Sequence, residues 1–279
     1  MSNKFISPLT WPGGKAKKWN LIKSYFPKDT KDMTYFEAFF GGGSVGLNAL
    51  KEKLFKEYYF NDIDFKLIMF WVGISETNWL QWKHLFYPNV KDINILKDQK
   101  VQDKTVYYLM KNNLTFNGQQ WGTWTQKRLE QNWNLNKFDR IINCSNLLAY
   151  NRNKINWKCD NFLDILDYEW KFDSNTFMYL DPPYYLNKGK PYRYKFTVEQ
   201  FNLFKDVVDK HSKMGVKILI SLDDCFEVRE LFKDYYIYEA EWKYTSTNTK
   251  YHKVKLGKEL FITNYEVKNI NENEDITKI

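Results

Sequence analysis

The stretch Tyr35-Phe36-Glu37-Ala38-Phe39-Phe40-Gly41-Gly42-Gly43-Ser44 decides the fold. It begins with a short apolar run that is typical of a buried strand, and the three glycines that follow allow a tight turn. Ser44 is a favourable helix N-cap, and apolar residues from Val45 to Leu54 then recur at helical spacing. The stretch therefore predicts a strand, a glycine turn and a helix.

Three more strands are predicted along the chain. The runs Glu57–Asn61 and Thr176–Leu180 are rich in aromatic residues, and each is followed directly by an aspartate, Asp62 or Asp181. Residues 216–222 form a third run that has the apolar character of a strand buried on both faces. Two of the three strands thus end at a carboxylate.

A long helix is predicted immediately before the last of these strands. Thr197 and Gln200 have the spacing of a capping box, and Gly215 is placed to end the helix. The apolar stripe of this helix consists of Phe201, Phe204, Val208 and His211. We interpret His211 as a helix-face residue.

The alternation of strands and helices predicts an α/β fold with a doubly wound, mostly parallel sheet. Ligands of such sheets bind beyond the carboxyl ends of the strands, so we expect Gly41, Asp62 and Asp181 to converge on one crevice. Residues 66–145 lack a clear strand run and predict an inserted helical lobe. We expect residues 1–65 and 146–268 to form the main domain, and residues 269–279 to form a flexible tail.

The composition is that of a folded protein with an excess of rings and positive charge. Of 279 residues, 43% are hydrophobic and 27% charged, which is ordinary for globular proteins, whereas 19% are aromatic. The net charge of +8 favours polyanionic partners. Basic residues cluster in residues 1–35, 188–195 and 243–258, and the last two stretches contain no acidic residue. Such clusters are suited to neutralising phosphates, although each could also be an ordinary solvated face.

The cysteines and histidines indicate neither disulfides nor a metal site. Cys144, Cys159 and Cys225 are odd in number and include no Cys-x-x-Cys pair, which favours a reducing compartment. The three histidines lie far apart, so we expect no bound metal. No apolar run is long enough to span a membrane. We therefore expect a cytoplasmic protein without membrane contact.

The segment Gly41 to Gly46 has the G-x-G-x-x-G spacing of nucleotide-binding turns, and Asp62 follows at the distance of a ribose-binding carboxylate. This signal is weak, because a strand-to-helix turn needs glycine for steric reasons and Asp62 could cap a helix. A nicotinamide oxidoreductase and an S-adenosylmethionine enzyme are both compatible with it. No set of residues for hydride transfer is evident.

The motif Asp181-Pro182-Pro183-Tyr184 is more specific. An exocyclic aromatic amine is a poor nucleophile, so a catalyst must hold its two N–H groups with acceptors. The Asp181 carboxylate and the Pro182 carbonyl are two such acceptors, and Tyr184 offers a ring on which an extruded base can stack. The prolines stiffen the loop because they fix φ near −65°. The alternative is a plain Pro-Pro turn.

Three motifs together resemble those of the Dam-type (D12 class) DNA adenine-N6 methyltransferases: Trp11-Pro12-Gly13-Gly14-Lys15, Phe39-Phe40-Gly41-Gly42-Gly43-Ser44 and Asp181-Pro182-Pro183-Tyr184. Their order also matches, and the resemblance runs from about residue 7 to Tyr265. Weaker support comes from residues 61–64, 159–162, 221–224 and 259–262. The resemblance implies a methyltransferase fold of the Rossmann-like type with a target-recognition lobe at residues 66–145.

The resemblance also implies site residues. The catalytic residues would be Asp181, Pro182 and Tyr184. The residues that bind S-adenosyl-L-methionine would be Trp11, Lys15, Phe39, Gly41, Gly43, Asp62, Asn161, Phe162 and Asp181. Within this set, Lys15 suits the cofactor carboxylate, Asp62 the ribose hydroxyls, and Asn161 with Phe162 the edge and face of its adenine. Trp11 could instead be a packing residue.

The DNA-binding residues would come from the lobe and from two basic stretches. They are Asn117, Gly118, Gln119, Trp121, Arg193, Lys195, Lys250 and Lys253. The residues Asn113 to Gly118 resemble the start of the family's recognition hairpin. Where members that recognise GATC place an arginine, however, this chain has Gln119, Gln120 and Trp121, and Thr10 stands where many members have lysine. The sequence therefore does not support GATC specificity.

From these observations the sequence predicts an adenine-specific DNA methyltransferase that uses S-adenosyl-L-methionine, flips its target base and acts as a monomer on double-stranded DNA, as in restriction-modification. The alternatives are an RNA adenine or protein glutamine methyltransferase, which share the amine chemistry, and a DNA-binding specificity protein on an inactive methyltransferase fold.

Overall fold

The computed structural model describes residues 4–118, 122–165, 172–185, 196–243, 256–267 and 276–278. The chain divides into two compact units, which we describe separately. The first contains Met1–Asn20 and Phe40–Cys159, and the second contains Leu21–Phe39 and Asp160–Ile279. The short helices η1 (Ala16–Lys18) and α1 (Trp19–Ser24) carry the chain from the first unit into the second.

The first unit contains a parallel strand pair, β2 (Glu57–Asn61) and β3 (Ile155–Lys158), in which Tyr58 lies opposite Ile155. The glycine turn and α2 (Gly46–Lys51) precede β2. The strand predicted at residues 57–61 is confirmed, and Asp62 follows it directly. The turn, the helix and the strand thus occur in the predicted order.

The start of α2 differs from the prediction in one respect. Ser44 does not cap the helix: the cap position is one residue later, at Val45, which has helical dihedral angles and no side-chain hydrogen bond. The carbonyl of Ser44 instead accepts a hydrogen bond of 2.7 Å from the Asn48 side chain. The helix ends at Lys51, so Leu54 lies beyond it.

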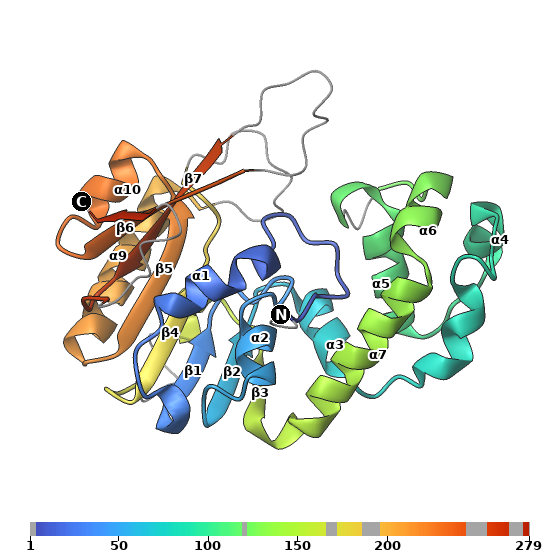
Figure 1. Cartoon of the computed structure of the whole chain (residues 1–279), viewed down its shortest axis with the longest axis horizontal. Coiled ribbons are helices and arrows are strands. Elements are labelled where there is room, and N and C mark those ends of the chain that lie inside the picture. Colours follow the sequence, from blue (N-terminus) through green and yellow to red (C-terminus); the bar gives the residue numbers. More distant parts are fainter. Residues whose placement is uncertain are drawn as a thin grey trace. The chain divides into compact units, whose positions relative to one another are not determined.

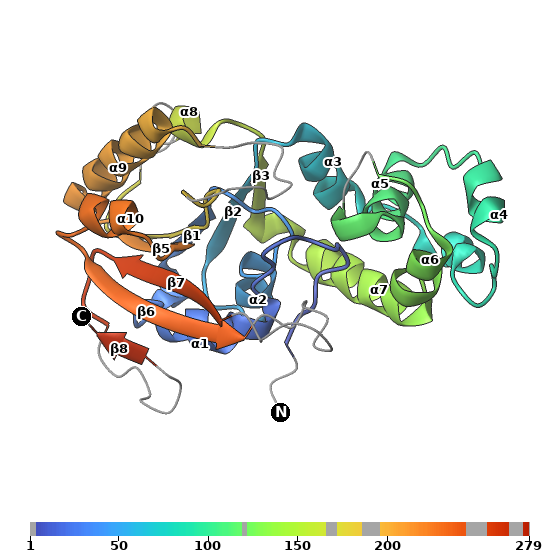
Figure 2. The same ribbon diagram turned by 90° about the horizontal axis from the view of Figure 1, so that it is seen from above.

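The described residues between β2 and β3 form helices and no strand (Figures 1 and 2). This agrees with the helical character predicted for that region, whereas the domain boundaries at residues 66 and 145 stay a prediction. Side chains cap several of these helices, including Asp64, Asp103, Thr125 and Asn134. The elements are α3 (Phe65–Gly73), η3 (Trp79–Leu85), α4 (Ile93–Asp98), α5 (Lys104–Leu114), η4 (Phe116–Gly118), α6 (Gln126–Asn132), α7 (Leu135–Tyr150) and η5 (Arg152–Lys154).

The second unit contains a sheet that is parallel at one end and antiparallel at the other. Its parallel strands are β1 (Thr34–Glu37), β4 (Thr176–Leu180) and β5 (Lys217–Asp223), with β4 between the other two. The next strands, β7 (Leu256–Thr263) and β6 (Tyr236–Lys243), are antiparallel. The predicted mostly parallel α/β fold is confirmed, and the strand predicted at 216–222 is present one residue later.

A short strand, β8 (Ile276–Lys278), pairs with β6 in the antiparallel sense. It lies within residues 269–279, which the sequence predicts to be a flexible tail. These three residues are paired because β6 would otherwise present unpaired backbone groups at the edge of the sheet, and a short polar segment can satisfy them.

The helices of the second unit are η2 (Thr30–Asp32), α8 (Phe162–Asp164), α9 (Val198–Lys213) and α10 (Phe226–Leu231). The predicted capping box of Thr197 and Gln200 is present at the start of α9, and the predicted stripe of this helix is buried. Figures 1 and 2 show α9 beside β5, against which it packs. Gly215 follows the helix with a φ of 86°.

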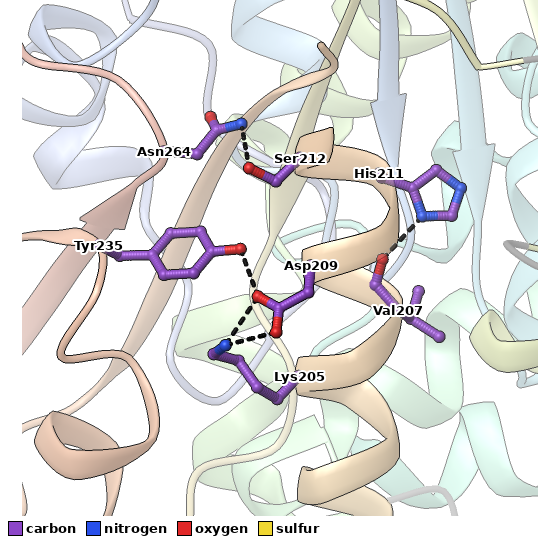
Figure 3. A network of polar contacts seen from close by, with 7 residues as sticks. All are labelled: Lys205, Val207, Asp209, His211, Ser212, Tyr235 and Asn264. Carbon is purple, nitrogen blue, oxygen red and sulfur yellow. Dashed lines mark hydrogen bonds and ion pairs between the residues drawn. The ribbon is translucent and has the colours of Figure 1, made fainter. Parts of the chain in front are cut away.

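Polar contacts join α9 to Tyr235 and also link residues within the helix (Figure 3). The Tyr235 hydroxyl donates a hydrogen bond of 2.7 Å to Asp209, which also forms a 2.7 Å ion pair with Lys205. The Nδ1 atom of His211 lies 2.8 Å from the Val207 carbonyl, and the imidazole is buried. His211 is therefore a helix-face residue, as predicted.

Rings fill the cores of both units, which accounts for the aromatic content of the sequence. In the first unit Phe40 stacks on Phe60 with 4.3 Å between ring centres, next to Trp71 and Trp157. In the second unit Phe39 contacts Phe162, Phe196 and Phe204. Among the described residues, no helix is long and apolar enough to cross a membrane.

Candidate active site

Hydrogen bonds hold both the amide and the carbonyl of Gly41, the first residue of the glycine turn. The Gly41 amide donates a 2.9 Å hydrogen bond to Asp62, and the Gly41 carbonyl accepts one of 3.0 Å from the Trp71 indole. Gly41 and Gly43 have φ values of 48° and 67°, a conformation that other residues rarely adopt. The turn therefore needs glycine at both positions for its backbone conformation.

Trp11 lies directly against this turn. A Cβ atom added to Gly41 would be 2.7 Å from the indole Nε1 of Trp11, and one added to Gly42 would be 2.7 Å from the Cβ of Trp11. The N-terminal Trp-Pro-Gly-Gly-Lys motif and the glycine turn, which are separate in the sequence, thus form one packed arrangement. Trp11 is half-buried, so the packing interpretation of this residue is supported by an observed contact.

Asp62 lies where β2 ends and is held by backbone amides. Its Oδ2 accepts the hydrogen bond from Gly41, and its Oδ1 accepts one of 3.0 Å from the amide of Asp64. Burial raises the pKa of the Asp62 carboxyl to about 6, although these amides oppose the shift. A carboxylate has about four lone-pair positions in all, so Asp62 can accept ligand hydroxyls in addition to these amides.

Lys15 is buried at the end of the N-terminal motif, with 5% of its surface exposed. Its ammonium group donates a 3.4 Å hydrogen bond to the carbonyl of Gly13. Burial of a lysine is unusual unless its charge is compensated. Trp11, Lys15, Gly41, Gly43 and Asp62 all belong to the first unit.

The segment before Trp11 is held by buried polar side chains of the helical region. Asn112 accepts a 2.7 Å hydrogen bond from the Thr10 amide and donates one of 3.1 Å to the Thr10 carbonyl. Asn113 and Lys137 donate bonds of 3.2 and 2.8 Å to the Pro8 carbonyl. We call residues Pro8, Leu9 and Thr10 the N-terminal strap. The strap places Trp11 on the glycine turn, and nothing in the sequence pattern indicated these partners.

The Asp181–Tyr185 loop of the second unit leaves β4, and two carboxylates hold its far end. The Tyr184 hydroxyl donates a hydrogen bond to Oε1 of Glu259 in β7, and the Tyr185 amide donates one of 2.9 Å to Asp223 at the end of β5. Pro182 is buried, whereas Asp181 and Tyr184 are half-buried. The structure thus fixes the tyrosine ring and the backbone beside it. Glu259 and Asp223 had only weak support in the sequence, through the motifs that contain them.

The remaining predicted cofactor residues of the second unit form one aromatic cluster. Phe39 lies 5.0 Å from Phe162 between ring centres, and Phe162 stacks on Phe196 at 5.1 Å. Asn161 accepts a 3.1 Å hydrogen bond from the amide of Leu163 and so caps α8. The structure therefore brings Phe39 and Phe162 together. The convergence of this cluster and the Asp181–Tyr185 loop with the residues of the first unit stays a prediction.

Most predicted DNA-binding residues lie outside the described residues. These are Gln119, Trp121, Arg193, Lys195, Lys250 and Lys253. Asn117 and Gly118 belong to η4, and Gly118 packs against the N-terminal strap, because a Cβ atom there would be 2.2 Å from the Thr10 carbonyl oxygen. For Gly118 the structure thus supplies a packing reason.

No candidate metal centre is found among the described parts of the chain: they contain no group of three or more His, Cys, Asp and Glu side chains that could hold an ion.

Comparison with protein families gives one match that covers most of the chain. The model for the D12 class N6 adenine-specific DNA methyltransferases matches residues 11–161 and 123–246. Both specific motifs of the first unit and the Asp181–Tyr184 motif lie inside these ranges.

Two curated relatives are methyltransferases by name. The modification methylase StsI of Streptococcus sanguinis is 26% identical over 313 residues, which cover 97% of this chain and 44% of that protein. The type II methyltransferase M.MjaIII of Methanocaldococcus jannaschii is 25% identical over 251 residues, which cover 76% of this chain and 82% of that protein. This chain thus spans less than half the length of the StsI methylase.

Among solved structures, a SAM-dependent methyltransferase from Agrobacterium tumefaciens matches with a TM-score of 0.46 and 11% identity, covering 91% of this chain and 62% of that one. The precorrin-8w decarboxylase of Methanobacterium thermoautotrophicum matches with a TM-score of 0.45 and 10% identity, covering 95% of this chain and 100% of that one.

Proposed function

This chain belongs to the D12 class of N6 adenine-specific DNA methyltransferases, and from that premise we propose that it transfers a methyl group from S-adenosyl-L-methionine to N6 of adenine in double-stranded DNA. The observation that carries the proposal is the Asp181–Tyr185 loop, whose tyrosine hydroxyl and following amide are bound to Glu259 and Asp223. A loop held in this way offers an oriented ring next to a carboxylate and a backbone carbonyl.

The residues of the first unit fit the proposed cofactor by the chemistry of their donors and acceptors. In the proposal Asp62 accepts the ribose hydroxyls at the end of β2, where its oxygens are already oriented by two backbone amides. Lys15 pairs with the cofactor carboxylate. Trp11, Gly41 and Gly43 shape the turn against which the methionine part lies, while Phe39, Asn161 and Phe162 serve the adenine side.

In the proposed reaction the protein positions the amine and supplies acceptors for its protons. The cofactor supplies an electrophilic methyl group on its sulfonium sulfur. The Asp181 carboxylate and the Pro182 carbonyl accept the two N–H groups of the target adenine, which aligns the nitrogen lone pair for attack. The amine becomes acidic only once the methyl group has been transferred, so Asp181 needs to be an oriented acceptor rather than a strong base.

The adenine must leave the duplex to reach these acceptors, so we propose that the target base flips and stacks on Tyr184. The phosphates of the DNA are neutralised by basic residues that include Arg193, Lys195, Lys250 and Lys253, and the region of Asn117, Gly118, Gln119 and Trp121 reads the bases. Binding should then weaken steeply with salt, because each phosphate contact releases counterions.

The test is methyl transfer by the purified protein. Tritiated S-adenosyl-L-methionine is incubated with unmethylated duplex DNA, and the product is digested to nucleosides and separated. Label in N6-methyladenine supports the proposal. Label only with RNA or protein substrates, or DNA binding without transfer, would replace it with one of the alternatives raised by the sequence.

The sharpest variant is Asp181→Ala, which removes one of the two acceptors. We expect turnover to fall by at least about 1,000-fold, since correct alignment of the amine is lost together with a charge-assisted hydrogen bond. The matched control is Asp206→Ala, which removes an exposed aspartate on α9. The thermal midpoint should match that of the control, which shows that the fold is intact; an active Asp181→Ala protein would overturn the assignment.

One relative is named a modification methylase and the other a type II methyltransferase, so we further propose that the reaction serves DNA modification in a restriction-modification system. Mapping methylated positions on genomic DNA from cells that express the protein would give the recognition sequence. Resistance of those positions to a matching endonuclease would support this role.

A further inference from the structure

A buried carboxylate beside the proposed catalytic loop has no role in the reaction described above. Glu259 in β7 has 1% of its surface exposed. Its Oε1 accepts two hydroxyl hydrogen bonds, one from Tyr184 and one of 2.6 Å from Ser221 in β5. Three elements that are distant in the sequence therefore meet at one carboxylate oxygen.

The strand register explains how Glu259 reaches the loop. In the antiparallel pair of β5 and β7, Asp223 lies directly opposite Glu259. Asp223 binds the Tyr185 amide and Glu259 binds the Tyr184 hydroxyl. Two carboxylates on neighbouring strands thus hold two consecutive residues of the loop, one through its backbone and one through its side chain.

Burial of a carboxylate is costly unless strong hydrogen bonds compensate it. A hydrogen bond to an ionised acceptor is stronger and shorter than a neutral one, and a buried acceptor tolerates little displacement of its donor. The bond from Tyr184 to Glu259 therefore restricts the rotation of the tyrosine side chain about its Cα–Cβ bond. The Ser221 hydroxyl orients the carboxylate itself.

We propose that Glu259 is a positioning residue, which holds the Tyr184 ring in place so that an extruded adenine stacks on it in register with Asp181. This inference rests on the proposed function, because it names the device that orients the base in that site. Glu259 contacts neither the base nor the cofactor in this proposal, and it acts only through Tyr184.

The variant that isolates this role is Tyr184→Phe, which keeps the ring and removes only the hydroxyl. Its partner is Glu259→Gln, which keeps an acceptor oxygen and removes the charge. We expect each variant to lower kcat by about 10- to 100-fold, the range for losing a charge-assisted hydrogen bond at a site where alignment matters. KM for the cofactor should stay within about twofold, since Glu259 does not contact it.

A spectroscopic readout separates positioning from a general loss of structure. Duplex DNA with 2-aminopurine at the target position becomes fluorescent when the base leaves the stack, and the signal is quenched when the base stacks on an aromatic ring. For both variants we expect the flipped base to be less quenched than with the wild-type protein, with the Kd for DNA nearly unchanged. Asp206→Ala, the exposed control on α9, should give wild-type values throughout.

The double variant Tyr184→Phe with Glu259→Gln completes the test. If Glu259 acts through Tyr184, the double variant should be no slower than the worse single variant, because both remove one interaction. Additive losses in kcat, or wild-type kcat and fluorescence in Tyr184→Phe, would overturn the positioning role. Should Glu259→Gln fail to fold, Tyr184→Phe with its fluorescence decides alone.

The failure of this inference is distinguishable from failure of the proposed function. If the wild-type protein transfers no methyl group to DNA, the proposed function is wrong. If it does and the two variants behave like the control, only the role of Glu259 is wrong.

Discussion

The glycine turn of the first unit and the Asp181–Tyr185 loop of the second unit both follow a strand, and both carry a motif that the sequence reveals. They differ in what holds them. The turn needs its glycines because of positive φ at Gly41 and because Trp11 packs against it. The loop is held by Asp223 and Glu259, carboxylates 38 and 75 residues away from the loop residues that they bind.

This difference shows how much a motif reveals about chemistry. Glycines at a strand-to-helix turn have a sufficient reason in packing, so by themselves they say little about a ligand. The Asp181–Tyr185 loop combines two stiff prolines with a tyrosine hydroxyl and a backbone amide that two carboxylates bind, one buried and one half-buried, and a turn does not need this combination. The observation that bears on function in the first unit is therefore Asp62 rather than the glycines.

The packing account of the turn predicts the largest effects on stability. Gly41→Ala should lower the free energy of unfolding by about 3 kcal/mol, since it combines an unfavourable φ with a collision with Trp11. Gly42→Ala should cost about 2 kcal/mol through the collision alone. Gly14→Ala is the matched control, because its added Cβ would meet other atoms only at 3.4 Å. Denaturant titrations measure all three.

The same two glycine substitutions, made in a protein that lacks the Trp11 side chain, test the packing explanation more strictly. In a Trp11→Gly protein both the Cβ and the indole of residue 11 are absent, so Gly42→Ala should become nearly neutral, whereas Gly41→Ala should still cost about 1 kcal/mol for its φ. If Gly42→Ala lowers the free energy of unfolding equally with and without the Trp11 side chain, packing against Trp11 is not the reason for the glycine. The proposed difference between the turn and the loop would then be wrong.

The proposed role of Asp62 predicts a pH-dependent cofactor affinity of intermediate size. The raised pKa of about 6 means that the carboxyl becomes protonated, and a poorer acceptor, as the pH falls through that value. Affinity for S-adenosyl-L-methionine should then fall by up to about tenfold between pH 7 and pH 5. Asp62→Asn should bind about 10- to 100-fold more weakly at pH 8 and lose this dependence.

The same pKa has a consequence for the free protein. Because the folded state binds the proton of Asp62 more tightly than the unfolded state, stability from this group falls as the pH rises from about 4 to 6.

Calorimetric titration with S-adenosyl-L-methionine across this pH range, with Asp206→Asn as the control, measures the cofactor affinity. If the cofactor affinity of Asp62→Asn depends on pH as that of the wild-type protein does, Asp62 does not bind the cofactor as proposed.

Lys137 gives an effect that depends on pH, and it bears on the strap that places Trp11. Burial lowers the pKa of Lys137 to about 7, with a smaller contribution from Arg140. The unfolded chain therefore binds more protons than the folded one between about pH 7 and the usual value of 10.5, so stability should rise with pH in this window. The slope is at most about 1.4 kcal/mol per pH unit.

Lys137→Met keeps most of the buried volume and removes the titrating group, so its stability should be flatter than that of the wild-type protein from pH 7 to 10. Denaturation midpoints at four pH values, with the exposed Lys127→Met as control, measure the difference. If stability changes equally with pH in the wild-type protein and in Lys137→Met, titration of the buried amine that binds the strap does not affect stability.

The order of the elements and the family follow from local features of the amino-acid sequence. Strands such as 57–61 and 176–180, the capping box of α9 and the buried stripe ending at His211 depend on periodicity and on residues a few positions apart, and these local preferences survived in the fold. The family followed from three short motifs, since they combine residue types that a turn or a proline loop alone would not need. The predicted cap at Ser44 was wrong, since the helix has its cap position at Val45.

Only the tertiary structure decided which side chains hold these motifs. These contacts join distant positions of the chain. Trp11 packs on Gly41, 30 residues away, and Asn112 binds Thr10 of the strap, 102 residues away. Tyr184 binds Glu259, 75 residues away. Such contacts depend on strand register and on helix packing, and one sequence carries no local signal for either. A buried Asn, Lys or Glu looks in the sequence like any exposed polar residue until the fold removes it from water.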